Sequence, residues 1–172
     1  MGKIKKRTLC IIFIFVAWLA IIFSFSAMNS NSSTDLTDIA INATSHLREK
    51  SPLIDSFFTK LTENHSLFYI IRKLAHVFVF CMLEIIAFFL FKHLGFSWLK
   101  SAIFSIGTVF IYACTDEFHQ LFVSGRSGQI SDVMIDTFGG VIGLSISLVL
   151  LSVKTILKNI LLSFKNKKKS TD

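Results

Sequence analysis

The stretch LAHVFVFCMLEIIAFFLF, residues 74–91, contains only two polar residues, His76 and Glu84, among 18. A helix of this length nearly crosses the apolar core of a bilayer, which takes about 20 residues. Three other stretches are comparable: residues 9–28, 98 to about 122, and about 133 to 153. With 52% hydrophobic residues and 19 Phe among 172 residues, the composition exceeds what a soluble domain needs. The sequence therefore predicts an all-α integral membrane bundle of about four transmembrane helices.

Basic residues are concentrated on one side of these spans. They precede the first span, lie between the second and third, and follow the fourth, so that 12 of the 18 Lys and Arg residues share a side. Short loops rich in Lys and Arg stay in the cytoplasm. We therefore expect a multi-pass protein of the cell membrane with both termini in the cytoplasm. This topology and attraction to anionic membrane lipid account for the net charge of +7, so no nucleic-acid partner is expected.

Composition divides the chain into four parts. Residues 1–28 are expected to form an N-terminal transmembrane anchor, although their basic start and small residues near Ser24 also fit a cleaved signal peptide. Residues 29–71 are expected to form an extracytoplasmic linker with short amphipathic helices. Residues 72–153 form the predicted three-helix membrane core, and residues 154–172 a basic cytoplasmic tail with an interfacial helix.

Local signals refine this division. Ser51 and Pro52 predict the start of an outer amphipathic helix, and Ser131 is expected to cap the fourth span. In that span, a small residue recurs at every fourth position. This pattern suits close packing of helices, either within the chain or in a homodimer. Its members are Gly139, Gly143 and Ser147.

A charged segment interrupts the apolar pattern at the end of the third span. It begins Thr115-Asp116-Glu117-Phe118-His119-Gln120, passes through a turn that contains Arg126, and continues to Asp132 and Asp136. Ionisable groups at membrane depth are costly, and they indicate a functional site by default. The segment is therefore the principal candidate for function.

The depth of the polar residues along their helices predicts that they meet. His76, Asp116 and Asp136 each lie about one turn, roughly 6 Å, inside the outer end of a span. Residues three or four apart share a helix face. This spacing pairs Arg72 with His76, Asp116 with His119 and Gln120, and Asp132 with Asp136. We therefore expect three polar faces around one pocket on the extracytoplasmic side.

Two further acids need separate partners. Glu117 points about 100° away from Asp116 on the helix. Glu84 lies deeper in the second span, where a hydrogen bond between helices is the favoured interpretation.

Two classes of function use the polar residues of the predicted pocket. As an enzyme, the protein would act on an anionic lipid-linked or cell-wall substrate, with His76, Asp116 and Glu117 as the catalytic acids and bases. The candidates for substrate binding are Arg72, Lys73, Gln120, Arg126, Asp132 and Asp136. As a binding or transport protein, the same groups would recognise a headgroup or an antibiotic, or relay protons, without covalent chemistry. A purely structural network that fixes the packing of three helices is a third alternative.

No cofactor is expected and no metal ligand is assigned. One variant of the enzyme hypothesis nevertheless has a divalent cation, because carboxylates and one imidazole suit several metals. Its ligands would be Asp116, Glu117, His119 and Asp136.

The chain resembles the VanZ-like family of bacterial membrane proteins at three blocks. They are RKLAH at 72–76, DEFHQLF at 116–122 leading to Gly-Arg at 125–126, and DVMID at 132–136 followed by Gly139, Gly140 and Gly143. The likeness covers residues 69–150 approximately. The chain departs from the family at Val79 and Phe80, where Glu and Tyr are common, and at Asp136, where Asn is common. The resemblance implies a role at the cell envelope in reduced susceptibility to teicoplanin and related lipoglycopeptides, and it implies no defined reaction.

Overall fold

The computed structural model describes residues 6–27, 42, 45, 49–61, 67–123 and 126–169. The elements of this part of the chain are helices: α1 (Lys6–Ser26), α3 (Pro52–Leu61), α4 (Leu67–His93), α5 (Trp98–Gln120) and α6 (Ile130–Lys169). Four of them, α1, α4, α5 and α6, are long and apolar enough to cross a membrane. The predicted all-α bundle with four transmembrane helices is therefore confirmed.

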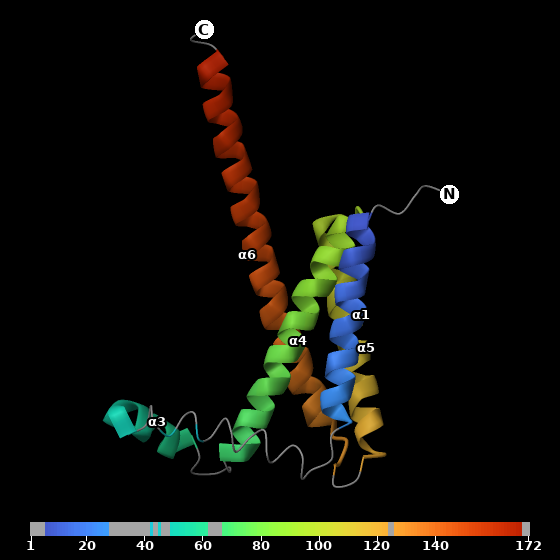
Figure 1. Cartoon of the computed structure of the whole chain (residues 1–172), viewed down its shortest axis with the longest axis vertical. Helices are drawn as coiled ribbons and strands as arrows, with labels where there is room; N and C mark the ends of the chain where they lie inside the picture. The colour runs from blue at the N-terminus through green and yellow to red at the C-terminus, as the bar shows by residue number, and fades with distance from the viewer. Residues whose placement is uncertain are drawn as a thin grey trace.

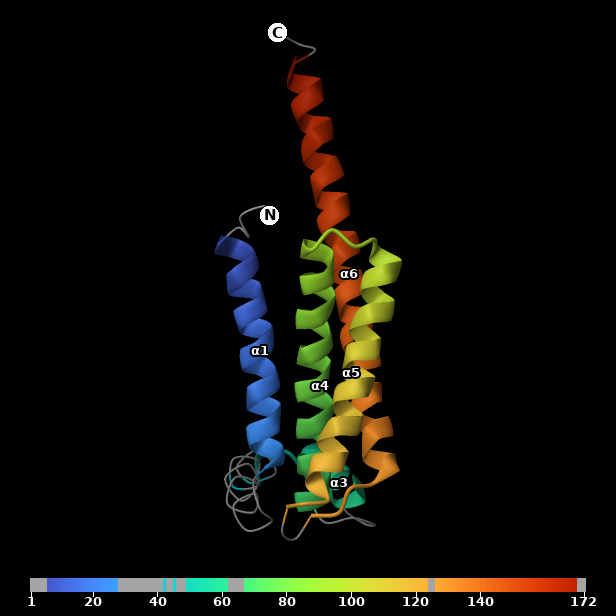
Figure 2. The ribbon, with the colours of Figure 1, turned by 90° about the vertical axis from the view of Figure 1, so that its right-hand side faces the viewer.

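Helices α4, α5 and α6 pack side by side, and α1 lies against α4 and α5 (Figures 1 and 2). The centre of the bundle is formed by fully buried apolar side chains such as Phe80, Leu83 and Val109. Helix α1 is fixed by two hydrogen bonds to backbone carbonyls. The indole of Trp18 donates to the carbonyl of Val79 at 3.0 Å, and the hydroxyl of Tyr112 donates to that of Leu19 at 2.6 Å.

Helices α4 and α6 cross in direct backbone contact (Figure 1). A Cβ atom on Gly139 would lie 2.5 Å from the carbonyl oxygen of Val77, and one on Gly143 would overlap the carbonyl oxygen of Cys81. Ser147, the third small residue of the pattern, is fully buried. The small-residue pattern therefore serves a contact inside the chain, and a role in a homodimer stays a prediction.

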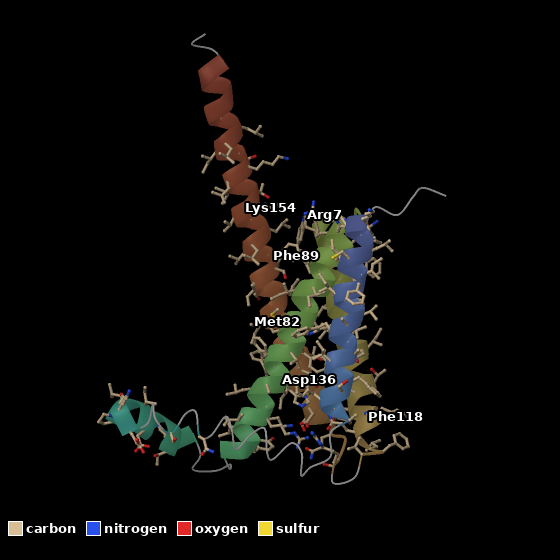
Figure 3. All side chains as sticks on the ribbon, in the orientation of Figure 1. Arg7, Met82, Phe89, Phe118, Asp136 and Lys154 are labelled. Atoms are coloured by element: carbon tan, nitrogen blue, oxygen red, sulfur yellow. The ribbon has the colours of Figure 1, made fainter. Side chains whose placement is uncertain are left out.

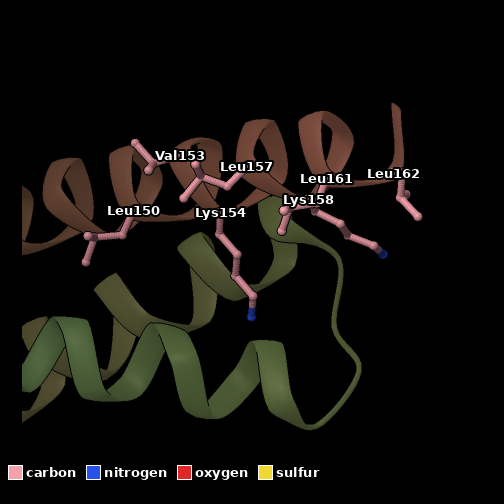
Figure 4. Close-up of a pocket in the computed structure, with 7 residues that line it drawn as sticks. All are labelled: Leu150, Val153, Lys154, Leu157, Lys158, Leu161 and Leu162. Atoms are coloured by element: carbon pink, nitrogen blue, oxygen red, sulfur yellow. The ribbon is translucent and has the colours of Figure 1, made fainter. Parts of the chain in front are cut away.

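Helix α6 is longer than expected. It runs without a break from Ile130 to Lys169, 40 residues that correspond to about 60 Å, and its C-terminal part extends beyond the bundle (Figure 2). The predicted fourth span and the predicted interfacial helix of the tail are parts of this one helix, because the sequence near residue 153 contains no Gly or Pro to stop it. One side of the extension has a shallow, mostly apolar depression whose lining includes Lys154 and Lys158 (Figure 4).

The two predicted helix starts have different outcomes. Helix α3 begins at Pro52, as expected. Helix α6 begins one residue before Ser131, and the amides of Asp132 and Val133 donate to the carbonyl of Gln129 at 2.9 and 3.4 Å. Ser131 is therefore not the cap that the sequence suggested. The other expected outer helix, near residues 36–47, lies almost entirely outside the described residues.

Candidate functional site

Polar and charged side chains gather inside the bundle where α5 ends and α6 begins. Figure 3 labels Asp136 at this end, far from Lys154 on the extension of α6. We call this group the polar cluster; it consists of Arg72, Lys73, His76, Asp116, Glu117, Gln120, Arg126, Asp132 and Asp136. Its four acids are at most 7% exposed, and Gln120 is fully buried. Carboxyl groups buried to this extent inside a membrane bundle require specific partners.

Helix α5 supplies three neighbouring members of the polar cluster. The amide nitrogen of Gln120 donates to Asp116 Oδ2 at 3.0 Å and to Glu117 Oε1 at 3.2 Å. The second oxygen of Glu117 accepts a hydrogen bond from the backbone amide of Gln129 at 2.9 Å. The shared face of Asp116 and Gln120 is confirmed. Glu117 has the separate partner that was expected, the amide of Gln129, and in addition shares Gln120 with Asp116.

The loop after α5 closes over this end of the bundle through Gly128. A Cβ atom at this position would overlap the backbone oxygen of Glu117, so only glycine lets the loop approach α5 so closely. This approach brings the amide of Gln129 within reach of Glu117. Sequence reasoning missed Gln129, because a backbone donor leaves no mark in the side-chain pattern.

Helices α4 and α6 are joined by two charged contacts, one helical turn apart on each helix. Lys73 forms an ion pair with Asp132. His76 Nδ1 lies 3.2 Å from Asp136 Oδ1, in hydrogen-bond contact. The side chains of Lys73 and His76 are 17% and 20% exposed, and the two acids that they contact are more deeply buried.

Arg126 lies in the loop between α5 and α6 and is only partly exposed. Burial, and then the positive charge of Arg72, lower the pKa of Arg126, while Asp116 and Glu117 act in the opposite direction. Arg72, Asp116 and Glu117 therefore all lie near enough to Arg126 to interact with its charge. The expectation that Arg126 lies near the polar residues of the three helices is met.

One residue from each core helix contributes to a potential metal-ligand set. Ligand atoms of His76, Asp116 and Asp136 all lie within 4.8 Å of one another. The set suggested by the sequence differs, because the ring of His119 lies 4.5 Å from that of Phe23 on α1. Glu117 is held by Gln129 and Gln120. The common depth of His76, Asp116 and Asp136 along their helices is the sequence signal that indicated the observed set.

A second polar group lies deeper in the bundle, outside the polar cluster. The fully buried carboxyl group of Glu84 accepts hydrogen bonds from Ser105 at 2.7 Å and from Ser147 at 3.3 Å. These bonds connect α4 with α5 and α6. The favoured interpretation of Glu84 as a hydrogen-bonded link between helices is confirmed.

These features define a multi-pass helical membrane protein with ionisable groups enclosed in its bundle. The model of the VanZ/LLP1 family matches residues 11–151, most of the chain, and the chain belongs to this family. The match includes most of α1, the whole of α4 and α5, and the half of α6 that carries Asp132 and Asp136. No curated protein and no solved structure matches the chain.

Proposed function

We propose that the chain acts at the cell envelope by binding an anionic headgroup of a lipid-linked or cell-wall molecule at the polar cluster. This action lowers susceptibility to teicoplanin and related lipoglycopeptides, as membership of the VanZ family suggests. The observation that carries the proposal is the gathering of three basic side chains, Arg72, Lys73 and Arg126, beside the four buried acids at one end of the bundle. A phosphate or carboxylate between two guanidinium groups relieves their repulsion and accepts paired hydrogen bonds from each.

The distribution of basic residues supports an extracytoplasmic position for the polar cluster. The starts of α1 and α5 and the end of α4 lie at the end of the bundle opposite the polar cluster, where α6 extends outward (Figures 1 and 3). The basic residues of these segments include Lys6, Arg7, Lys92, Lys100, Lys154 and Lys158. Such residues favour the cytoplasmic side. The polar cluster would then meet headgroups of the outer leaflet.

Acid–base chemistry is the second candidate, and the contact between His76 and Asp136 favours it. A buried carboxylate on one ring nitrogen fixes the orientation of an imidazole and leaves the other nitrogen available for proton transfer. In this candidate the same site binds the headgroup and modifies it. Binding alone would tolerate loss of the carboxylate charge at Asp116 better than catalysis would.

Binding is tested with the purified full chain in nanodiscs, with a polyprenyl phosphate as the probe. Arg72→Gln and Arg126→Gln should each weaken binding by at least about tenfold, because hydrogen bonds to charged groups contribute about 1.5–3 kcal/mol. Lys154→Gln, at the opposite end of the molecule, is the matched control and should bind like the wild type. Equal affinity in all four proteins would refute the proposed site.

The cellular test compares a teicoplanin-susceptible bacterium carrying the wild type with strains carrying His76→Ala, Asp116→Asn or Glu117→Gln at equal protein levels. Teicoplanin susceptibility is measured together with mass spectra of membrane lipids and cell-wall precursors. A changed metabolite that disappears in the three variants supports chemistry. Protection without any metabolite change supports binding alone, and unaltered susceptibility with the wild type would contradict the role in resistance.

A further inference from the structure

We propose that His76, Asp116 and Asp136 bind one divalent transition-metal ion, Zn²⁺ or Mn²⁺, inside the bundle. The inference rests on the polar cluster also used in the proposed function, and it adds a cofactor to that site. Each of the three core helices supplies one ligand, so an ion would also tie α4, α5 and α6 together. An imidazole with two carboxylates is a ligand set that suits both metals.

The distances between the candidate ligand atoms are close to those around a bound ion. Two ligands of a tetrahedral ion with bonds of about 2.1 Å are roughly 3.4 Å apart. The candidate ligand atoms lie within 4.8 Å of one another, and His76 Nδ1 and Asp136 Oδ1 are 3.2 Å apart. The third ligand atom is therefore at most about 1.4 Å farther from the other two than the spacing around a tetrahedral ion requires.

Two buried oxygen atoms without hydrogen-bond partners provide a second, independent observation in favour of a bound ion. Asp136 is fully buried, yet its Oδ2 atom has no hydrogen-bond partner among the described residues. The buried amide oxygen of Gln120 also has none in this part of the chain. A buried carboxylate oxygen without a partner is costly, and a bound cation removes the cost.

One candidate ligand is held in place by a hydrogen bond from a neighbouring side chain, as ligands in known metal centres are. Gln120 donates to Asp116 Oδ2 and thereby fixes the orientation of this carboxylate. Hydrogen bonds of this kind hold metal ligands in position and are themselves needed for tight binding. The hydrogen bond from Gln120 uses Oδ2, so the other carboxylate oxygen of Asp116 can bind the ion.

The charge balance also favours a cation. With every carboxyl group ionised and histidine neutral, the polar cluster has four negative charges and three positive ones, which leaves one excess negative charge. A dication would reverse the sign to a net positive charge, and metal ions are often the largest local charges in such sites. The polar cluster would then attract an anionic headgroup more strongly than it does without the ion.

The inference is tested on the full chain, purified in detergent and stripped with a chelator. Zn²⁺, Mn²⁺ and the spectroscopic substitute Co²⁺ are titrated separately, and bound metal is measured by elemental analysis. We expect one ion per chain and visible Co²⁺ absorption bands that report nitrogen and oxygen ligands. His76→Ala and Asp136→Asn should weaken binding by at least about 10–100-fold, the loss that removal of an outer-shell partner already causes.

Glu84→Gln is the matched control, because it neutralises a buried acid outside the ligand set. It should bind metal like the wild type, and size-exclusion chromatography establishes that each variant is folded. A wild type that binds none of the three ions, or equal affinity in the wild type and the ligand variants, would overturn the inference. An equal loss in Glu84→Gln would also overturn it.

To test metal binding and headgroup binding independently, the polyprenyl phosphate titration is repeated with the metal-loaded and the stripped wild type. Metal binding without phosphate binding in either form would refute the proposed function and leave the ion. Phosphate binding by a chain that binds no metal would overturn this inference alone.

Discussion

Replacement of Gly143 by Ala tests the backbone contact between α4 and α6. The added Cβ would overlap the carbonyl oxygen of Cys81 and lie 3.0 Å from the Cβ of Glu84, a fully buried residue. Neither atom is the end of a flexible side chain, so the two helices must separate. Overpacking of this kind costs about 1–3 kcal/mol.

Helix propensity acts in the opposite direction. Ala is favoured over Gly in a helix by about 0.8–1.0 kcal/mol, so we expect Gly143→Ala to lose roughly 0–2 kcal/mol of unfolding free energy. Gly107 provides a matched control on α5, because a Cβ atom there meets no atom within 4 Å. Gly107→Ala should therefore gain up to about 1 kcal/mol. The difference between the two variants isolates the cost of the crowded crossing, about 1–3 kcal/mol.

The assay is unfolding of the purified chain in mixed micelles by added sodium dodecyl sulfate, followed by circular dichroism. The midpoint should shift to lower detergent for Gly143→Ala and to higher detergent for Gly107→Ala. Equal midpoints for the two variants, or a more stable Gly143→Ala, would show that α4 and α6 do not meet backbone to backbone at this position.

Three further predictions concern the contacts around the core. Glu84→Ala should destabilise the bundle by at least about 1 kcal/mol, since each interhelical hydrogen bond contributes about 0.6 kcal/mol and the shorter side chain leaves a cavity. Glu84→Gln keeps the size of the side chain and should lose less; an equal loss in the two variants would contradict this account. Tyr112→Phe should increase hydrogen exchange in α1, measured by mass spectrometry, because it removes a bond to α1 that contributes about 0.5–1.5 kcal/mol; unchanged exchange would count against the docking of α1. Lys73→Met should cost about 2 kcal/mol in the same unfolding assay by leaving Asp132 unpaired, and adding Asp132→Asn should restore most of it; failure of this rescue would refute the pairing.

The local features of this protein were accessible from the sequence. Unbroken apolar runs predict membrane-spanning helices, because a bilayer offers the backbone no other hydrogen-bond partners. The spacing of four residues between Asp116 and Gln120 predicts a contact that depends only on the pitch of one helix, and the contact is present at 3.0 Å. Family membership also follows from the sequence, which matches the VanZ/LLP1 model over residues 11–151.

The partners across helices were decided by the tertiary structure. The sequence offered both His76 and His119 as partners for the acids, yet His76 lies beside Asp136 while His119 packs on Phe23 of α1. The amide of Gln129 reaches Glu117 only because the loop folds back over α5. Helical periodicity determines which residues share a face, but the rotation of each helix about its axis depends on how it packs against its neighbours. In this chain the glycines at the crossing let α4 and α6 approach backbone to backbone, and the packing of the helices determines which acids meet which bases.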